Sequence, residues 1–311
     1  MGIDRPDDGD TPGGVPARGP GNDAAPLLDP EARIAEHAGH RATVEGVYAA
    51  AREAWTEALP GLRSAWEKHE ERYPERERLA PRTHPDGSWA ADGGRELTPE
   101  RHVEATGACA EIRAEGLAVV LPAMRRVESA DPERRLAGLQ HMLKGEDRLK
   151  EKVADILLLE SNLTAREALA KVPDAVRFTL TYSTERYADG VRADVERLKA
   201  EGFKLIKLKN LWTDDQYKGI NSQWRRPETG LRFEMQFHTP ESLEAKELTH
   251  KAYERLRRPA TETTETERDE LEDYQRRVNA LLAIPPCATD IENFPEKRND
   301  DGRHNLLRGP R

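Results

Sequence analysis

The stretch Arg232-Phe233-Glu234-Met235-Gln236-Phe237-His238-Thr239 alternates apolar and polar side chains without a break. Because successive side chains of a β-strand point to opposite faces, this pattern predicts a strand whose Phe and Met residues face a core. The other face then carries a carboxylate, an amide and an imidazole in one row. The strand stops at Thr239-Pro240, and α/β proteins often place their chemistry where strands end at a sheet edge. An ordinary amphipathic strand with a solvated face is the alternative at this point.

The composition is that of a polar chain, long enough for one large domain or two small ones. Of its 311 residues, 34% are charged and 36% are hydrophobic, and its net charge is -9. This acidic balance argues against a protein that coats nucleic acid over its whole surface, but it is compatible with a local basic pocket for a phosphorylated molecule. Cys109 and Cys287 stand far apart, which indicates neither a disulfide framework nor a zinc site.

No apolar run approaches the length that spans a bilayer, and Met1 is followed by acidic and Gly/Pro-rich residues rather than by a signal-peptide pattern. We therefore expect a cytoplasmic protein without membrane contact, with export by a signal-independent route as the alternative.

The first half of the chain is predicted to be a tail followed by helices. Residues 1–28 are rich in Gly, Pro, Asp and Ala, cannot bury enough apolar surface to fold, and are expected to be disordered. Residues 30–77 have helical periodicity that Pro60-Gly61 should interrupt, and residues 79–96 should form a loop. Thr98 is the expected N-cap of a helix to about Val127, and Asp131-Pro132-Glu133 should open another. Residues 29–140 thus form a helical region in which nothing looks catalytic.

Strands and helices alternate in residues 141–258, which predicts an α/β layer. The expected strands span 175–182, 203–210 and 217–225, and turn residues at 227–230 should join the last of these to the 232–239 strand as a hairpin. The expected helices begin near residues 145 and 187 and span 243–257. Residues 259–311 should hold a loop, a helix over about 267–282 and a mobile charged tail. The predicted fold class is mixed α/β or α+β, a sheet flanked by helices with a largely helical N-terminal half.

Lys144, Arg148 and Lys152 recur every four residues and therefore form one row on a predicted helix. Like charges at this spacing repel one another, and the free N–H groups at a helix start also attract anions, so the row suits a polyphosphate. Glu146 and Glu151 are local partners, and a solvated charged face is the alternative.

These segments resemble, in order and approximate spacing, the synthetase domain of the RelA/SpoT-type alarmone synthetases over about residues 140–258. Glu-Met-Gln-Phe-His-Thr at 234–239 matches the family's Glu-Ile-Gln-x-Arg-Thr, and His250 and Tyr253 follow where the family carries a His and a Tyr. The Lys144 to Lys152 segment is similar to the family's Lys-Ser-x-x-Ser/Arg-x-x-x-Lys, which grips the ATP phosphates. Asp174 and Arg177 fall where the family has a metal-binding Asp and an Arg near the adenine.

The resemblance implies a nucleotidyltransferase-like mixed five-stranded sheet and a Mg²⁺-dependent nucleotide pyrophosphokinase. Such an enzyme moves the β,γ-pyrophosphate of ATP to the 3'-hydroxyl of a purine nucleotide, releasing AMP and making a (p)ppGpp- or (p)ppApp-like alarmone of the stringent response. Asp174 and Glu234 would hold the metal, and Glu234 would also orient the proton of the attacking hydroxyl. The residues implied to seat ATP are Lys144, Arg148, Lys152 and Arg177. Those implied to seat the acceptor are Lys207, Lys209, Tyr217, Asn221, Ser222, Gln236 and His238.

Strand parity places Asp174 on the apolar face, with Val176 and Phe178. However, Pro173 precedes it, and a strand often begins only after a proline. If Asp174 lies just before the regular strand, the alternation of faces does not apply to it.

The sequence departs from the family at the acceptor site. The family's Gly-Tyr-x-Ser-x-His is Gly-Ile-Asn-Ser-Gln-Trp at residues 219–224 here, so an acceptor base would have to stack on Tyr217 or Trp224. The family's Arg has become His238, which lacks the bidentate fork and the permanent charge. This divergence resembles the toxin or broad-specificity branch of the family.

Two functional alternatives stay open. The same chemistry could act on the 3' end of tRNA in a toxin with a cognate antitoxin, served by the basic residues Lys204, Lys207, Lys209, Lys218, Arg225 and Arg226. A non-catalytic module that binds a nucleotide or a partner is the other alternative, and a homo-oligomer is a further partner expectation. The His-Asp dipeptide of the family's hydrolase domain is absent from the sequence, so we expect synthesis without hydrolysis.

Overall fold

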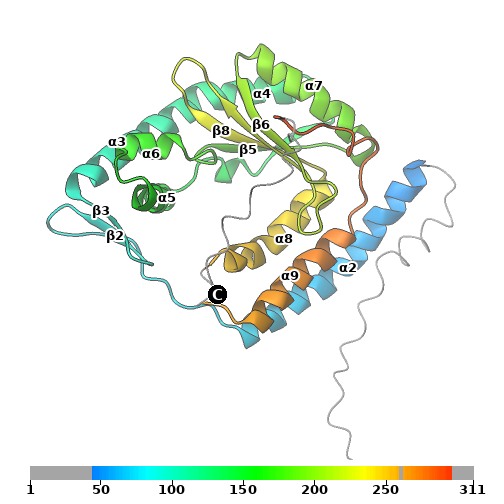
Figure 1. Cartoon of the computed structure of the whole chain (residues 1–311). Helices are drawn as coiled ribbons and strands as arrows, with labels where there is room; N and C mark the ends of the chain where they lie inside the picture. Colours follow the sequence, from blue (N-terminus) through cyan, green and yellow to red (C-terminus); the bar gives the residue numbers. More distant parts are fainter. Residues whose placement is uncertain (1–43, 259–261, 296–311) are drawn as a thin grey trace, which may run out of the picture.

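The computed structural model describes residues 44–258 and 262–295, and its centre is a five-stranded sheet (Figure 1). The tail expected over residues 1–28 lies outside the described residues. The strands are β4 (Arg135–Ala137), β5 (Arg177–Thr181), β6 (Lys204–Asn210), β7 (Ile220–Arg225) and β8 (Arg232–His238). Their order is β4-β5-β8-β7-β6, in which β5 and β8 are parallel and the other neighbours antiparallel. The predicted mixed sheet is therefore confirmed.

One face of the sheet is apolar and packs against α4 (Leu121–Ser129) and α7 (Tyr187–Ala200). The alternation quoted first supplies this face, since Phe233, Met235 and Phe237 are all fully buried in the central core. Figure 1 shows α4 and α7 on this side of the sheet, and α8 (Pro240–Leu256) on the other. The polar face of the sheet therefore faces α8.

A helical layer supports α8 from outside. α2 (Val44–Arg72) and α9 (Glu265–Ala280) lie side by side along it (Figure 1), around a core that includes Trp55, Leu62 and Leu271. α2 runs unbroken through Pro60, so the interruption expected there is wrong. Proline removes one backbone N–H, and the buried residues on both sides of Pro60 hold the helix together.

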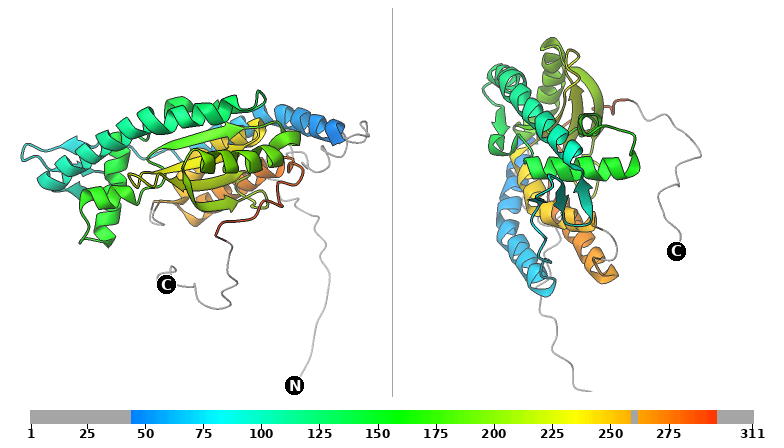
Figure 2. Two further views of the ribbon diagram at one scale, coloured as in Figure 1. Left: turned by 90° about the horizontal axis from the view of Figure 1, so that it is seen from above. Right: turned by 90° about the vertical axis from the view of Figure 1, so that its left-hand side faces the viewer.

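The remaining elements form a third cluster, beside the start of β5. They are α3 (Pro99–Glu115), α5 (Glu146–Leu159), α6 (Ala165–Ala170) and the small antiparallel sheet of β1 (Arg82–Thr83), β2 (Trp89–Ala91) and β3 (Arg95–Leu97). The expected N-cap is confirmed, because the Thr98 side chain accepts a hydrogen bond from the Arg101 N–H. A π-helical turn, η1 (Gly116–Val120), joins α3 to α4, and the three make one long rod along the molecule (Figure 2). Two 3₁₀ turns, η2 (Leu139–His141) and η3 (Thr184–Arg186), complete the elements.

Three expectations for the connecting segments are wrong. Residues 79–96 were expected to be a loop, yet they hold β1, β2 and β3, whose turns use glycines in the left-handed region such as Gly87. Asp131 opens no helix; its side chain accepts from the Glu133 N–H (3.0 Å) in a turn that leads into β4. The segment after Pro286 is packed as far as residue 295, because Phe294 and Leu208 exchange backbone hydrogen bonds that cover the edge of β6.

Within residues 44–258 and 262–295, no helix has both the length and the apolar character that crossing a membrane requires.

Candidate functional site

The polar face of the sheet carries a row of four predicted or neighbouring site residues, one from each of four strands. Arg177 of β5 lies opposite Glu234 of β8, which lies opposite Gln223 of β7, which in turn lies opposite Lys207 of β6. Directly opposed residues of neighbouring strands point to the same face. The carboxylate of Glu234 therefore lies in a row that has the cation Arg177 directly beside it and the cation Lys207 two strands away.

The next row along the same face is formed by Thr179, Gln236, Asn221 and Lys209. Glu234 and Gln236 lie in the middle of β8, two or more residues before the strand end at Thr239-Pro240 where the chemistry was expected to gather. α8 begins at Pro240, directly after β8, and its first turn buries the strand end.

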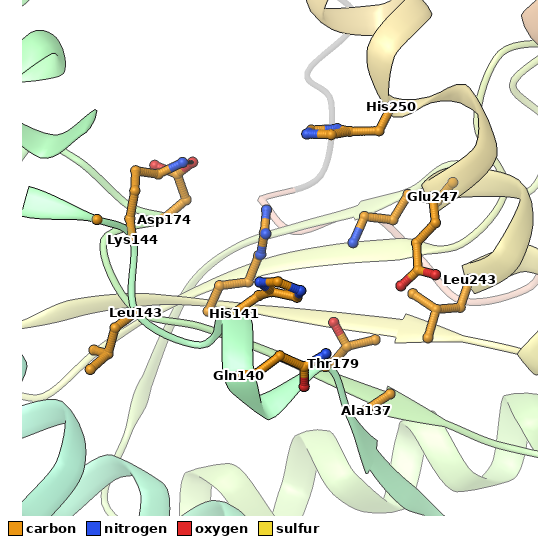
Figure 3. Close-up of a pocket in the computed structure, with 14 residues that line it drawn as sticks. Ala137, Gln140, His141, Leu143, Lys144, Asp174, Thr179, Leu243, Glu247 and His250 are labelled. Atoms are coloured by element: carbon orange, nitrogen blue, oxygen red, sulfur yellow. Dashed lines mark ion pairs between the residues drawn. The ribbon is translucent and has the colours of Figure 1, made fainter. Parts of the chain in front are cut away.

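A cavity of about 520 Å³ opens between this face, the start of α5 and α8 (Figure 3). In Figure 3, Lys144 and Asp174 lie on one side of the cavity and His250 and Glu247 of α8 on the other. The residues that line it are Ala137, Gly138, Gln140, His141, Leu143, Lys144, Gly145, Asp174, Arg177, Thr179, Leu243, Lys246, Glu247 and His250.

Asp174 lies in the turn before β5, which begins at Arg177. The alternation of side chains along β5 therefore does not place Asp174 on the apolar face, as the preceding Pro173 had suggested. The Asp174 Oδ1 accepts from the Lys152 Nζ at 2.7 Å, and its Oδ2 lies 3.1 Å from the Lys144 Nζ. Burial by itself raises the pKa of Asp174, but the hydrogen bond from Lys152 and the charge of Lys144 bring it below its ordinary value. The carboxylate is therefore ionised and held by two ammonium groups.

Glu234 is the second carboxylate of this site. Burial raises its pKa, the charge of Arg177 and a hydrogen bond from Gln236 oppose that rise, and the negative charge of Asp174 adds to it. The two carboxylates therefore interact electrostatically. The structure brings the predicted acidic pair to one site rather than to opposite sides of the molecule.

The donor set fits a magnesium ion that arrives with a nucleotide. Mg²⁺ is usually bound through one or two carboxylates together with phosphate oxygens and waters, and Asp174 and Glu234 offer two carboxylates. The described residues contain no group of three or more His, Cys, Asp or Glu side chains that would hold a metal ion by themselves. In the structure, the ammonium groups of Lys144 and Lys152 neutralise the charge of Asp174, the charge that a magnesium ion would otherwise neutralise.

Two further cations were predicted to seat ATP, Arg177 and Arg148. Arg177 lines the cavity, and forms no ion pair with a described acidic residue. Arg148 is not among the residues that line it; it pairs with Glu151 of α5 (2.7 Å) and Glu254 of α8 (3.2 Å). This second pair ties α5 to α8, so Arg148 connects the two helices that flank the cavity.

His238 was expected to bind the acceptor, and the structure corrects this. The side chain is fully buried, its Nε2 lies 2.8 Å from the Tyr217 Oη, and its Nδ1 lies 2.8 Å from the Ser242 Oγ. Burial, assisted by the charge of Lys246, lowers the pKa of His238 to about 3. A neutral imidazole with both nitrogens engaged is a structural group, and it packs directly on Gly219, which has no side chain.

Two residues of β7 point away from the site. Ser222 and Trp224 are fully buried on the apolar face, where the Trp224 Nε1 donates to the Ser222 Oγ (2.8 Å) and this hydroxyl donates to the Met235 carbonyl (2.9 Å). Neither can contact an acceptor, because strand parity aims both at the core. Tyr217 remains half-buried beside the polar face, where its hydroxyl donates to the Asn221 Oδ1 (2.7 Å).

Gln236 does lie on the polar face, but its amide is already engaged. Its Oε1 accepts from Lys246 (2.7 Å) and from the Thr179 hydroxyl (3.4 Å), and its Nε2 donates to Glu234. With 4% of its surface exposed, it offers almost no accessible surface to an acceptor. Of the residues predicted to seat the acceptor, Lys207, Lys209 and Asn221 are those that the polar face presents.

Sequence reasoning missed Lys246, which lines the cavity from α8. Burial and the charge of Arg177 lower its pKa to about 8. A signal was available, because Lys246 precedes His250 by four residues and therefore shares its helix face.

Comparison with known proteins gave matches among solved structures. No protein-family model matches the chain, and no curated protein does. The type VI effector Tas1, solved in complex with its immunity protein, is 18% identical over 58% of this chain and 96% of that chain, with a TM-score of 0.40. A GTP pyrophosphokinase family protein from Streptococcus pneumoniae is 13% identical over 57% and 85% of the two chains, with a TM-score of 0.35. Small alarmone synthetase 1 from Bacillus subtilis, solved with its product pppGpp, is 11% identical over 54% and 86%, with a TM-score of 0.36. Each of these matches covers little more than half of this chain.

Proposed function

We propose that this protein transfers the β,γ-pyrophosphate of ATP to the 3'-hydroxyl of a purine nucleotide and releases AMP. The observation that carries the proposal is the electrostatic interaction of Glu234 with Asp174 and Arg177, because Asp174 and Arg177 line a cavity together with Lys144. Pyrophosphoryl transfer spreads negative charge over the moving group and needs fixed cations more than covalent help. Lys144 and Arg177 offer such cations at the cavity.

The donor nucleotide would lie along the α5 side. Lys144 and Lys152, which hold Asp174 in the structure, would turn their ammonium groups to the ATP phosphates as Asp174 takes up Mg²⁺. The ion, when bound, supplies neutralising charge to the phosphate oxygens. Arg177 projects from β5 between this side and Glu234, and would bind the transferred group.

Glu234 would accept or orient the proton of the attacking 3'-hydroxyl. Its pKa is raised by burial, which brings a carboxylate closer to the working range of a general base. Lys207 and Lys209 of β6 continue the polar face beyond Glu234, together with Asn221. They would bind the phosphates of the acceptor on the side opposite to ATP.

AMP release tests the proposal. The protein is incubated with ATP and Mg²⁺ and with GDP, GTP, ADP or ATP as acceptor, and AMP is separated by ion-exchange chromatography. We expect AMP together with a 3'-pyrophosphorylated product for at least one acceptor, and none with the Glu234→Gln variant. If no acceptor, tRNA included, yields AMP, the enzymatic proposal is wrong and a nucleotide-binding module takes its place.

One observation favours a second candidate, the same transfer to the 3' end of tRNA. Lys204, Arg225 and Arg232 lie directly opposite one another on β6, β7 and β8, and none forms an ion pair with an acidic residue in the described part of the chain. Directly opposed like charges destabilise a sheet, and they extend the cationic face past the row of Glu234. Labelled pyrophosphate that reaches tRNA, but no free purine nucleotide, would establish this candidate instead.

A further inference from the structure

A continuous chain of hydrogen bonds links α8 to Glu234. The Lys246 Nζ donates to the Gln236 Oε1 at 2.7 Å, and the Gln236 Nε2 donates to the Glu234 Oε1. Lys246 thus reaches the carboxylate through one intervening amide. Lys246 has no assigned role in the motifs that relate this chain to alarmone synthetases.

The amide of Gln236 can take only one orientation in this chain. If it were flipped, its NH₂ group would face the ammonium of Lys246 and its carbonyl would face the carboxylate of Glu234, so both contacts would become repulsive. The Thr179 hydroxyl, which also donates to the Oε1 (3.4 Å), favours the same orientation. Lys246 therefore decides which atom of the amide faces Glu234.

The position of Lys246 is electrostatically costly. It is largely withdrawn from water and faces the like charge of Arg177, while Glu234 and Glu247 are the acidic groups that offset this. His250 lies one helical turn away on the same face of α8 and carries no compensating charge. A cation kept in such a place contributes little to stability, so its effect on the neighbouring carboxylate is the better explanation of its presence.

We propose that Lys246 is a positioning residue that acts through Gln236 to hold the Glu234 carboxylate in one orientation toward the cavity. The kinetic consequence rests on the proposed function, because Glu234 is the group that receives the hydroxyl proton there. The contact itself does not depend on that function. Lys246 thereby couples α8 to the centre of the sheet.

The kinetic test compares single and double variants in the AMP-release assay. Lys246→Met keeps the length of the side chain and removes its charge, and we expect kcat to fall about 10- to 100-fold, the usual loss when a partner behind a functional carboxylate is removed. The KM for ATP should stay nearly constant. Lys246→Met should add no further loss to Gln236→Met, because both break the same chain. Lys246→Arg should recover much of the rate, since it restores a charged donor.

Lys251→Met is the matched control. Lys251 lies on the same helix but pairs with Glu70 of α2 at an exposed site (2.7 Å), so its loss should leave kcat unchanged. A raised KM for ATP with an unchanged kcat in Lys246→Met would mean a direct phosphate contact and would overturn the proposal. Independent, multiplicative losses in the double variant would overturn it as well.

A spectroscopic measurement separates this proposal from the proposed function. The side-chain amide signals of Gln236, assigned by their absence in Gln236→Met, are recorded by NMR without substrate in the original protein and in Lys246→Met. We expect them to move, because the amide loses its fixed orientation, and circular dichroism checks that the variant is folded. Unmoved signals would refute the coupling. If the original protein releases no AMP, the proposed function fails while this measurement still decides the role of Lys246.

Discussion

Replacing His238 by glutamine should remove a large part of the pH dependence of stability. The imidazole is fully buried, and burial first and the charge of Lys246 second lower its pKa from 6.5 to about 3. In the unfolded chain the same group titrates near its ordinary value. Between these two pKa values the unfolded state binds one more proton than the folded state, so stability is lost as the pH falls.

The magnitude follows from the two pKa values. Each pKa unit corresponds to about 1.36 kcal/mol, so His238 accounts for a total of about 5 kcal/mol, all of it lost by a pH near its folded pKa. Between pH 7 and pH 5 the unfolded imidazole becomes almost fully protonated while the folded one stays neutral. This interval alone should lower the free energy of unfolding by about 2 kcal/mol.

Urea unfolding at pH 7, 6 and 5 measures the effect. The quantity of interest is the change in unfolding free energy with pH in the original protein minus the same change in His238→Gln. Asp174, His69 and the other titrating groups are present in both proteins and cancel in this difference. Equal pH dependence in the two proteins would refute the assignment of His238 as a neutral, buried imidazole and would reopen its role as a ligand of the acceptor.

Three further predictions concern the site and its support. Glu234→Gln should lower AMP release at least about 100-fold while ATP binding, measured by calorimetry, is largely retained, and full turnover would contradict its role. Lys152→Ala should raise the KM for ATP about tenfold, which corresponds to about 1.4 kcal/mol, and an unchanged KM would place ATP elsewhere. Gly219→Ala should lower the free energy of unfolding by about 2–4 kcal/mol. Its new Cβ would lie 2.7 Å from the His238 ring, at a φ of +146°. Gly107→Ala, in open space on α3, should instead be stabilising, and equal effects would refute the steric argument.

The sequence alone predicted much of the sheet. Alternation over 232–239 assigned each side chain of β8 to a face, and the same rule applied to β5, β6 and β7 gives the row of Arg177, Glu234 and Lys207 once the strands are paired. The row of Lys144, Arg148 and Lys152 was also predicted to lie on a helix, and Arg148 and Lys152 do lie on α5, whereas Lys144 precedes its N-cap, Gly145. These inferences hold because they depend on backbone periodicity, which short stretches of sequence encode.

The sequence did not predict how deeply each polar side chain is buried or which partners it has. His238 and Gln236 were placed on the correct face but were expected to bind an acceptor, and both are instead covered or engaged by residues of α8, which begins directly after β8. Lys246 was missed for the same reason, since its relation to Glu234 runs through a contact between a helix and a strand.

The amino-acid sequence by itself thus determined where β5, β6, β7 and β8 lie along the chain and which of their side chains share a face. The tertiary structure decided which polar groups reach the cavity and which form hydrogen bonds to other groups inside the protein. The physical reason is that side-chain direction is set by each element's own backbone geometry, whereas burial and hydrogen-bond partners are set by the elements that pack against it.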